Sequence, residues 1–366
     1  MTAVAIAGGG LIGLAVAWRA AQRGLDVTVI DDAPGTGASY AAAGMLAPVA
    51  EAAYGEEALL ALCRESLSRY PEFVAELERV TGHEVGLRTA GTIAVGFDAD
   101  DMRFLDAMHA FQVELGLDAR RLSARSVREV EPSLTPRVRG GVHVPGDLSV
   151  DGRAVHAALL VAARSAGASI VDDRVASWAD GSLQLLSGAT VRADVVVLAT
   201  GAWTVDGVPP VPVRPVKGQI LRLRGAHDLV SGTVRALVRG RPVYLVPYGK
   251  DGLVVGATVE DRGFDPTVTA GAVHDLLRDA IEVVPGVSEL ELVETLARWR
   301  PGTPDNAPLL GPLAPGLLLA TGHYRNGVLL TPVTGDAIAD LLTTGELPVV
   351  ARPFTLDRFV HSGESA

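Results

Sequence analysis

Gly8-Gly9-Gly10-Leu11-Ile12-Gly13 is the stretch of sequence that decides the fold. It follows a short apolar run at residues 4–7 and opens a segment, residues 11–23, with the composition of a helix that stops at Gly24. Gly8, Gly10 and Gly13 have the G-x-G-x-x-G spacing, which permits a tight turn, a close approach of backbone to a diphosphate, and close packing of helix on strand. Residues 27–30 then form a second apolar strand, so residues 4–30 predict a βαβ unit that binds a dinucleotide.

The end of that second strand carries two acidic residues, Asp31 and Asp32. A carboxylate at this position hydrogen-bonds a ribose hydroxyl, and Asp31 is nearer the strand end than its rival Asp32. An acid there disfavours a 2′-phosphate, which argues against NADP. The fingerprint itself does not distinguish NAD from FAD.

Size and charge narrow the class of protein. A chain of 366 residues with 48% hydrophobic residues is long enough for two domains with separate cores. The 32 basic residues against 43 acidic ones give a net charge of −11, which argues against a nucleic-acid partner. The single cysteine, Cys63, excludes a disulfide scaffold and a cysteine-based zinc site, and no metal site is predicted.

The N-terminal residues carry no charge up to Trp18 but do not resemble a targeting segment. No basic residue precedes the apolar stretch, and the glycines of the fingerprint interrupt it. No other apolar run is long enough to cross a bilayer. The sequence therefore predicts a cytoplasmic protein without a membrane partner.

Two kinds of element alternate along the chain. Strand–helix patterns recur at the beginning, the middle and the end, whereas residues 217–258 alternate apolar and polar side chains as an antiparallel sheet does. The predicted fold class is α/β, a Rossmann-like domain with a discontinuous antiparallel-sheet α+β domain. The dinucleotide domain is assigned to residues 1–80, 141–213 and 297–366, and the substrate-binding domain to residues 81–140 and 214–296.

Seven further blocks carry a family resemblance. They are SYAAAGML (39–46), VVLATGAW (196–203), PVKG (215–218), YLVP (244–247), VVGAT (254–258), RPGTPD (300–305) and GHYRNGVLL (322–330). With them the chain resembles the D-amino-acid-oxidase-like flavoproteins, most closely the glycine-oxidising group of thiamine biosynthesis. The resemblance implies FAD and a GR2-type FAD-binding domain. Because Cys63 lies outside these blocks, noncovalent FAD is expected.

The fingerprint and the resemblance together predict the cofactor-binding residues. Small side chains at 41–44 would let a flat isoalloxazine pass close to backbone, although the start of an Ala-rich helix has the same composition. Backbone N–H groups at Gly327 and Val328 would stabilise negative charge on the flavin. The full set is Gly8, Gly10, Leu11, Ile12, Gly13, Asp31, Asp32, Ser39, Ala42, Ala43, Gly44, Met45, Val175, Thr200, Gly201, Trp203, Arg300, His323, Arg325, Asn326, Gly327, Val328 and Leu329.

The resemblance also implies the substrate residues. Arg300 matches the arginine that binds the substrate carboxylate, Tyr244 the tyrosine that hydrogen-bonds it, and Arg325 a second active-site arginine. Taken singly, each arginine is more typical of an exposed surface side chain, and the tyrosine of half-buried packing in a strand. His323 is expected to be structural or to contact the flavin, since the chemistry needs no general base. Pro242 and Trp299 depart from the family pattern and put the limits of substrate specificity in doubt.

The predicted activity is oxidative deamination of glycine, with sarcosine or small D-amino acids as further substrates. Hydride would pass from Cα to flavin N5 and leave an imine, O2 would reoxidise the flavin to give hydrogen peroxide, and the imine would supply the thiazole of thiamine. The alternatives are an FAD-dependent dehydrogenase using another acceptor, a noncatalytic dinucleotide-binding protein and, least favoured, an NAD dehydrogenase. Family members imply a homo-oligomer, with a tetramer as one option.

Overall fold

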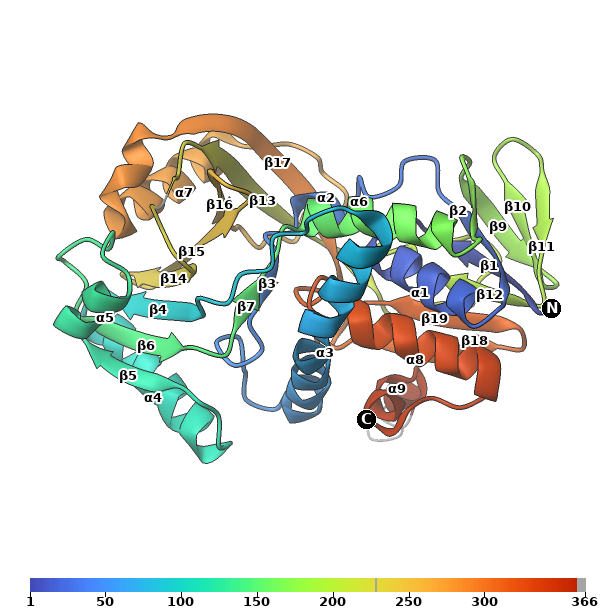
Figure 1. Cartoon of the computed structure of the whole chain (residues 1–366), viewed down its shortest axis with the longest axis horizontal. Helices are drawn as coiled ribbons and strands as arrows, with labels where there is room; N and C mark the ends of the chain where they lie inside the picture. The colour runs from blue at the N-terminus through green and yellow to red at the C-terminus, as the bar shows by residue number, and fades with distance from the viewer. Residues whose placement is uncertain (228, 361–366) are drawn as a thin grey trace.

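A mostly parallel sheet forms one half of the molecule in the computed structural model, which describes residues 1–227 and 229–360 (Figure 1). Its strand order is β18-β19-β12-β1-β2-β8, and only β18 runs antiparallel to its neighbour. The strands are β1 (Ala3–Ala7), β2 (Asp26–Ile30), β8 (Ser169–Val171), β12 (Val195–Leu198), β18 (Leu309–Ala314) and β19 (Leu317–Thr321). Three segments far apart in the chain thus build one sheet, which confirms the predicted Rossmann-like α/β class.

The two faces of this sheet are covered differently. Val4, Ile6 and Val29 share a core with the helices, whereas Ala5 and Val196 pack with Leu183 on the other face. The alternation follows from the pleat of the strands, and both faces are apolar because both are buried. The helices of the first face are α1 (Leu11–Gln22), α3 (Glu57–Thr81), α6 (Gly152–Ser165) and α8 (Thr331–Thr344); the other face carries β9 (Val175–Ala179), β10 (Ser182–Leu185) and β11 (Thr190–Arg192).

An eight-stranded sheet forms the other half, in the order β17-β13-β16-β15-β14-β4-β6-β5. Its pairs are antiparallel except β14 with β4. The strands are β4 (Thr92–Gly96), β5 (Arg120–Ser123), β6 (Gly140–Val144), β13 (Arg214–Arg224), β14 (Thr233–Val238), β15 (Arg241–Tyr248), β16 (Gly252–Gly256) and β17 (Glu291–Gly302). Helices α4 (Ala99–Glu114), α5 (Ala124–Val130) and α7 (Ala270–Val283) flank it.

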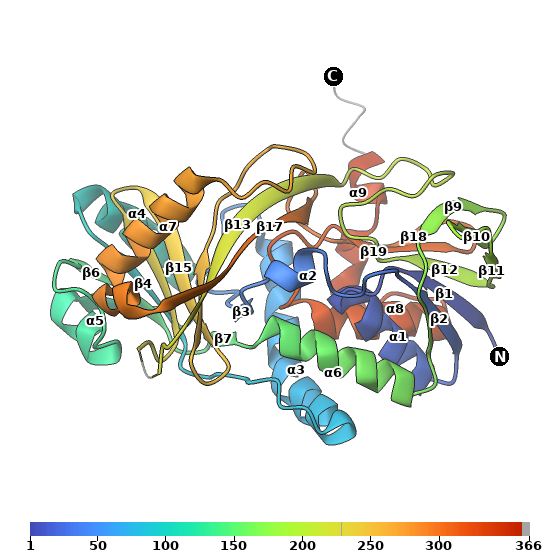
Figure 2. The ribbon, with the colours of Figure 1, turned by 90° about the horizontal axis from the view of Figure 1, so that it is seen from above.

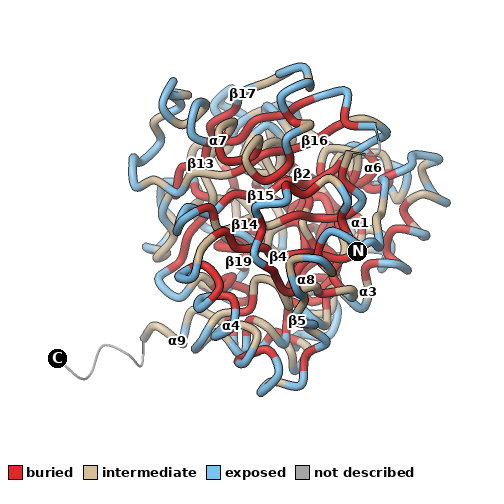
Figure 3. Tube along the Cα trace, turned by 90° about the vertical axis from the view of Figure 1, so that its left-hand side faces the viewer, coloured by how far each residue is buried: buried red, intermediate tan, exposed pale blue. Residues whose placement is uncertain are grey.

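A short helix and the ends of two long strands lie at the junction between the halves. Figure 2 shows α2 (Ala38–Ala41) beside the long strands β13 and β17 at this junction. The remaining elements are β3 (Met45–Leu46), β7 (Leu148–Ser149), α9 (Asp357–Val360) and the 3-10 turns Pro285–Glu289 and Val349–Phe354. Buried residues run through the interior of both halves, as Figure 3 shows.

Helix starts follow the sequence signals closely. Ser123, Asp151 and Thr269 each accept backbone N–H bonds as the caps of α5, α6 and α7. Two strands cross the expected domain boundaries: β6 and the whole of β17 belong to the eight-stranded sheet. The expected borders at 140/141 and 296/297 thus fall within β6 and within β17, and the division of the chain into domains stays a prediction. Within residues 1–227 and 229–360 no helix combines the length and apolarity that a bilayer span requires.

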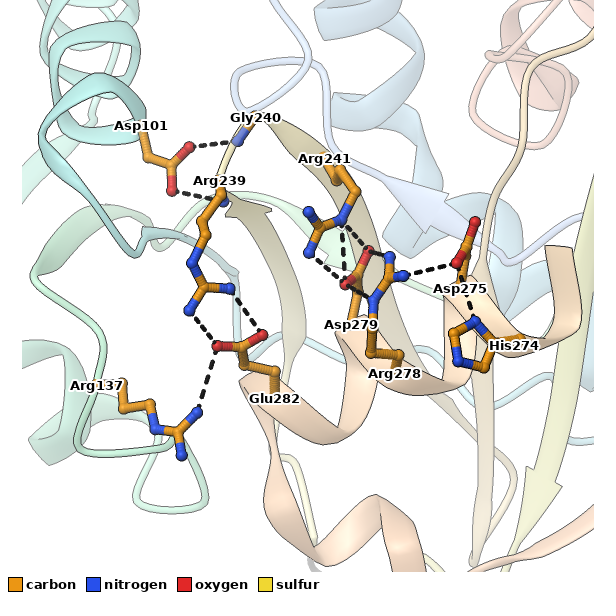
Figure 4. A network of polar contacts seen from close by, with 10 residues as sticks. All are labelled: Asp101, Arg137, Arg239, Gly240, Arg241, His274, Asp275, Arg278, Asp279 and Glu282. Atoms are coloured by element: carbon orange, nitrogen blue, oxygen red, sulfur yellow. Dashed lines mark hydrogen bonds and ion pairs between the residues drawn. The ribbon is translucent and has the colours of Figure 1, made fainter. Parts of the chain in front are cut away.

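A buried carboxylate ties α4 to the β14–β15 turn. Asp101, 2% exposed, accepts N–H bonds from Phe97 (2.9 Å), Asp98 (3.2 Å), Arg239 (3.0 Å) and Gly240 (2.8 Å). Figure 4 shows the carboxylate facing the turn, with the surface ion pairs of Glu282 and Asp279 beside it. The turn joins two strands that carry cavity residues, so Asp101 fixes a part of the sheet that matters to the site.

Asp101→Asn is expected to lower the free energy of unfolding by about 1.5–3 kcal/mol. The amide would turn an N–H donor toward backbone N–H groups that now share a charged acceptor, and the bonds to these groups are buried at Phe97 and part-buried at Gly240. Urea unfolding followed by circular dichroism measures the change. Asp100→Asn is the matched control, because the Asp100 side chain is exposed and pairs only with exposed Arg103; its change should stay within about 0.5 kcal/mol. Equal losses in both variants would contradict the role given to Asp101.

Candidate active site

A large cavity lies where the two halves meet, with a volume of about 590 Å³. Residues 8 and 10–12 of the glycine loop line it from the six-stranded half, and Tyr244 and Arg300 line it from the other half. The turn before α8 and the loop between α2 and β3 also contribute. The predicted cofactor and substrate residues are therefore brought together, with the exceptions described below.

The glycine loop needs its glycines for steric reasons. Gly8 has a φ of +110°, and a Cβ there would lie 2.4 Å from the carbonyl oxygen of Ala199. Gly13 does not line the cavity; a Cβ on it would lie 1.9 Å from the carbonyl oxygen of Gly8. Its role is to let α1 approach β1. Gly10 is different, since a Cβ there would meet only Ser39 Oγ at 3.3 Å and would otherwise point into open space.

Both predicted ribose carboxylates line the cavity, but each has protein partners. Asp31 accepts from the Gly9 N–H at 2.6 Å and from the Ala33 N–H at 2.8 Å. Asp32 pairs with Arg174 at 2.7 Å, and Arg174 also lines the cavity although the sequence did not single it out. Asp31 therefore shapes the glycine loop, and ribose binding by either residue stays a prediction.

The loop after α2 supplies a wall of small residues. Ala42, Ala43, Gly44 and Met45 all line the cavity. Gly44 has a φ of +88°, and a Cβ there would lie 1.8 Å from the carbonyl oxygen of Val150, so this glycine is dictated by a close backbone approach. Ser39 lines the cavity and accepts from the Leu11 N–H at 3.2 Å, at the start of α1. The other residues predicted on this side that line the cavity are Val175, Thr200, Gly201 and Trp203.

The turn before α8 matches the prediction only in part. Gly327 and Val328 line the cavity. Leu329, by contrast, is buried in the core beside the six-stranded sheet, and Asn326 lines a separate small pocket together with Glu56. The four residues are consecutive in the motif, yet the turn directs the first and the last away from the large cavity. Neither Asn326 nor Leu329 places its side chain at the large cavity.

His323 is a buried, neutral residue. Its Nε2 lies 3.0 Å from Thr334 Oγ1 of α8, and burial lowers the pKa of His323 to about 3. A histidine that stays uncharged at neutral pH and bonds a helix hydroxyl holds the turn in place. This favours the predicted structural role over that of a general base.

Tyr244 and Arg300 face the cavity from neighbouring parts of the eight-stranded sheet. Burial raises the pKa of Tyr244, which keeps it a phenol able to donate a hydrogen bond, while the charge of Arg300 acts in the opposite direction. Arg300 Nη1 donates to the Thr258 carbonyl at 3.2 Å, and the Arg300 side chain also hydrogen-bonds the Tyr244 hydroxyl; a guanidinium has five N–H donors, so others can serve a ligand. Arg325 also lines the cavity; it is exposed, with its guanidinium 5.2 Å from the Tyr324 ring centre.

Two glycines make room for these side chains, and the sequence did not assign them a role. A Cβ on Gly218 would lie 2.2 Å from Arg300 Nη1, and a Cβ on Gly256 would lie 2.3 Å from the Tyr244 ring. They belong to the PVKG and VVGAT blocks. A glycine inside a strand is itself a sequence signal, because it often marks a place where another group comes close to the backbone. The side chain that comes close could not be identified without the pairing of the strands.

Gly218→Ala is expected to raise the KM for the substrate by up to about 100-fold, because the methyl group would displace the Arg300 guanidinium from its present position. Steady-state kinetics measure the effect, and flavin absorbance checks that the cofactor is retained. Gly271→Ala is the control: this glycine lies in α7 with nothing within 4 Å of an added Cβ. An unchanged KM in Gly218→Ala would show that Arg300 does not act from this position.

The two departures from the family pattern both lie at the cavity. Pro242 lines it from β15. Trp299 lines it from β17, donates from Nε1 to the Asp265 carbonyl at 3.3 Å, and packs against Trp203 and Phe264. Both residues thus form part of the wall, and their effect on specificity stays a prediction.

The residues present fit a dinucleotide with a flat ring system. A glycine loop at the start of a helix, a wall of alanines and glycine, and backbone N–H groups before α8 line one continuous cavity. Cys63 is buried and is not among the residues that line it, and noncovalent attachment of FAD stays a prediction. Among the described residues no group of three or more His, Cys, Asp or Glu side chains is placed to hold a metal ion.

Comparison with known proteins gives the family. The model of the family described as FAD dependent oxidoreductase matches residues 3–341. A bifunctional protein ThiO/ThiG of Nostoc sp. is 37% identical over 93% of this chain and 52% of its own length, so the chain spans about half of that relative. The glycine oxidase of Geobacillus kaustophilus is 35% identical over 98% of this chain and 97% of its own length. The crystal structure of glycine oxidase from that organism superposes with a TM-score of 0.89 and 34% identity, covering 97% of this chain and 99% of that one. The predicted family and cofactor are confirmed: this chain belongs to the FAD dependent oxidoreductases.

Proposed function

We propose that the protein oxidises the amino group of glycine, with sarcosine and small D-amino acids as further candidates. The observation that carries the proposal is the placement of Arg300 and Tyr244 on the wall of the cavity that also contains the dinucleotide fingerprint. An arginine fork and a phenol are the groups that fix a carboxylate. The relatives named glycine oxidase share the whole length of the chain, which supports the same substrate here.

The chain's own part in the reaction is binding and orientation. Arg300 would hold the substrate carboxylate through its free N–H groups, and Tyr244 would donate to the same carboxylate as a neutral phenol. Bound FAD supplies the acceptor for the hydride that leaves Cα and the route by which O2 becomes hydrogen peroxide. The substrate loses two electrons and two protons and leaves as an imine, which water hydrolyses. His323, neutral and bonded to Thr334, takes no proton in this scheme.

The remaining parts of the proposal concern the cofactor residues and the setting. The predicted cofactor residues that line the cavity would bind FAD, with Gly13 acting through the packing of α1. We further propose that the imine of glycine supplies the thiazole of thiamine, and that the enzyme is a cytoplasmic homo-oligomer. An acceptor other than O2 is the second candidate activity for the same site.

The test is anaerobic mixing of the purified yellow protein with glycine. Loss of the flavin absorbance supports amine oxidation, and repetition with sarcosine and D-alanine ranks the substrates. Readmission of air, followed by assay of peroxide, distinguishes O2 from another acceptor. A yellow protein that none of the three compounds bleaches would overturn the substrate assignment.

A further inference from the structure

One row of paired residues crosses the eight-stranded sheet at the cavity. Val142 pairs with Ala94, Ala94 with Arg235, Arg235 with Tyr244, and Tyr244 with Gly256. All five line the cavity. Paired residues present their side chains on the same face, with Cβ atoms about 4.5–5.5 Å apart. Arg235 therefore stands between Tyr244, on the proposed substrate side, and the two small apolar residues beyond it.

Beyond Arg235 the cavity continues between α4 and the sheet. We call this part the apolar arm; its walls are Ala94, Leu105, Met108, Val142, Val144 and Leu237. Leu105 belongs to α4 and packs with Val142 and Val144. No charged side chain of the described residues lines the arm beyond Arg235 and its partner. An arm of this kind suits an apolar group and has no use in binding glycine.

An ion pair lies between the arm and Tyr244. Arg235 Nη1 lies 2.5 Å from Glu51 Oε1 and 4.0 Å from Met45 Sδ, so the pair joins the sheet to the loop after β3. The side chains of Arg235 and Glu51 are 28% and 14% exposed. A pair with this much shielding is less screened by water than a surface pair. The pair forms a bar that narrows the cavity between Tyr244 and the apolar arm without dividing it, because residues on both sides line the same cavity.

The loop that carries Glu51 is itself fixed. Asp147, fully buried, accepts from the N–H groups of Val49 (3.4 Å) and Ala50 (3.3 Å). Gln112 of α4 donates to the Val49 carbonyl at 2.9 Å. These bonds hold the backbone directly before Glu51 in place, so the fold sets where the Glu51 side chain starts.

We propose that the Glu51–Arg235 pair is a specificity determinant that limits the substrate to small amino acids by narrowing the way into the apolar arm. The inference rests on the proposed oxidation of glycine and adds to it the reason for the size limit. Removal of the pair would widen the passage between the substrate site and the arm. The substrates then admitted are glycines with an apolar N-substituent and D-amino acids with a large apolar side chain.

The test compares glycine with N-benzylglycine in the wild-type protein and in Glu51→Ala/Arg235→Ala. The double variant removes one charge of each sign and opens the bar. The ratio of kcat/KM for N-benzylglycine to that for glycine should rise by about 10- to 200-fold, the range expected when an apolar group gains an apolar pocket. Glu51→Gln/Arg235→Met is the matched control, because it removes both charges but keeps the volume; its ratio should rise much less.

A second substitution locates the bound group. Ala94→Leu in the open variant should fill the arm and abolish most of the gain, while in the wild-type protein it should leave the ratio as it was. An unchanged ratio in the open variant would overturn the inference, as would a wild-type protein that oxidises both compounds equally well; the second result is available even if the open variant loses FAD. Absence of glycine oxidation in the wild type would instead refute the proposed function, so the two failures are distinguishable.

Discussion

Arg300→Leu is expected to reduce kcat/KM for glycine by roughly 30- to 5,000-fold, the equivalent of about 2–5 kcal/mol for the loss of one partner of a shielded, hydrogen-bonded charge pair. The guanidinium lies on the cavity wall, where Nη1 donates to the Thr258 carbonyl and the side chain also contacts the Tyr244 hydroxyl. Its other N–H donors can serve a substrate carboxylate. Most of the loss should appear in KM, because the carboxylate is bound before and during the reaction.

Three comparisons sharpen this expectation. Arg300→Lys keeps the charge but loses the planar fork, so it should fall between the wild type and the leucine variant. Tyr244→Phe should cost less, about 0.5–1.5 kcal/mol, because it removes one hydrogen bond from a neutral group. Arg224→Gln is the control on the same sheet, since Arg224 is exposed and pairs only with exposed Glu291. Steady-state kinetics with glycine give kcat and KM. A leucine variant with the KM of the wild type would show that Arg300 does not bind the substrate.

Local patterns were sufficient for the dinucleotide-binding half. The glycine loop, the helix cap Asp151 and the apolar strands each have a signal within a few residues, and all of these elements are present. The borders of the domains were harder. β6 is a five-residue strand, GGVHV, that belongs to the eight-stranded sheet through its pairing with β4 and β5. No local pattern in the sequence shows that pairing.

The same limit applies to the site. Arg300 and Tyr244 were found through motifs, but Glu51 and Arg235 are 184 residues apart in the chain and meet only because the loop after β3 reaches β14. Gly218 and Gly256 were visible as strand glycines, yet their partners became clear only from the register of the sheet. Leu329 shows a different limit: its motif matches, but the turn before α8 directs its side chain into the core, and its contact with the cofactor stays a prediction. Motifs identify the kind of site, whereas pairing and turn geometry determine which side chains reach it.

Gly13→Ala should give the largest loss of stability, about 3 kcal/mol or more, and a protein purified without FAD. A methyl group at this position would sit 1.9 Å from the Gly8 carbonyl oxygen and 3.3 Å from Ala199 Cβ, both in the tightest part of the first half. The neighbours are the backbone of Gly8 on one side and Ala199, directly after β12, on the other, so no flexible side chain can move aside. Helix α1 would have to move away from β1, and the loop that faces the cavity would move with it.

Gly10→Ala provides the contrast that separates folding from cofactor binding. Gly10 has a φ of −75°, which alanine adopts without strain, and an added Cβ meets only Ser39 Oγ at 3.3 Å on the cavity side. The thermal midpoint of the apoprotein should therefore stay close to that of the wild type, while the Kd for FAD, measured by quenching of flavin fluorescence, should rise. Gly13→Ala should lower the midpoint even without FAD, because its clash is within the protein. If both variants lost FAD with equal and unchanged apoprotein stability, Gly13 would be a cofactor contact and not the residue that lets α1 pack on β1.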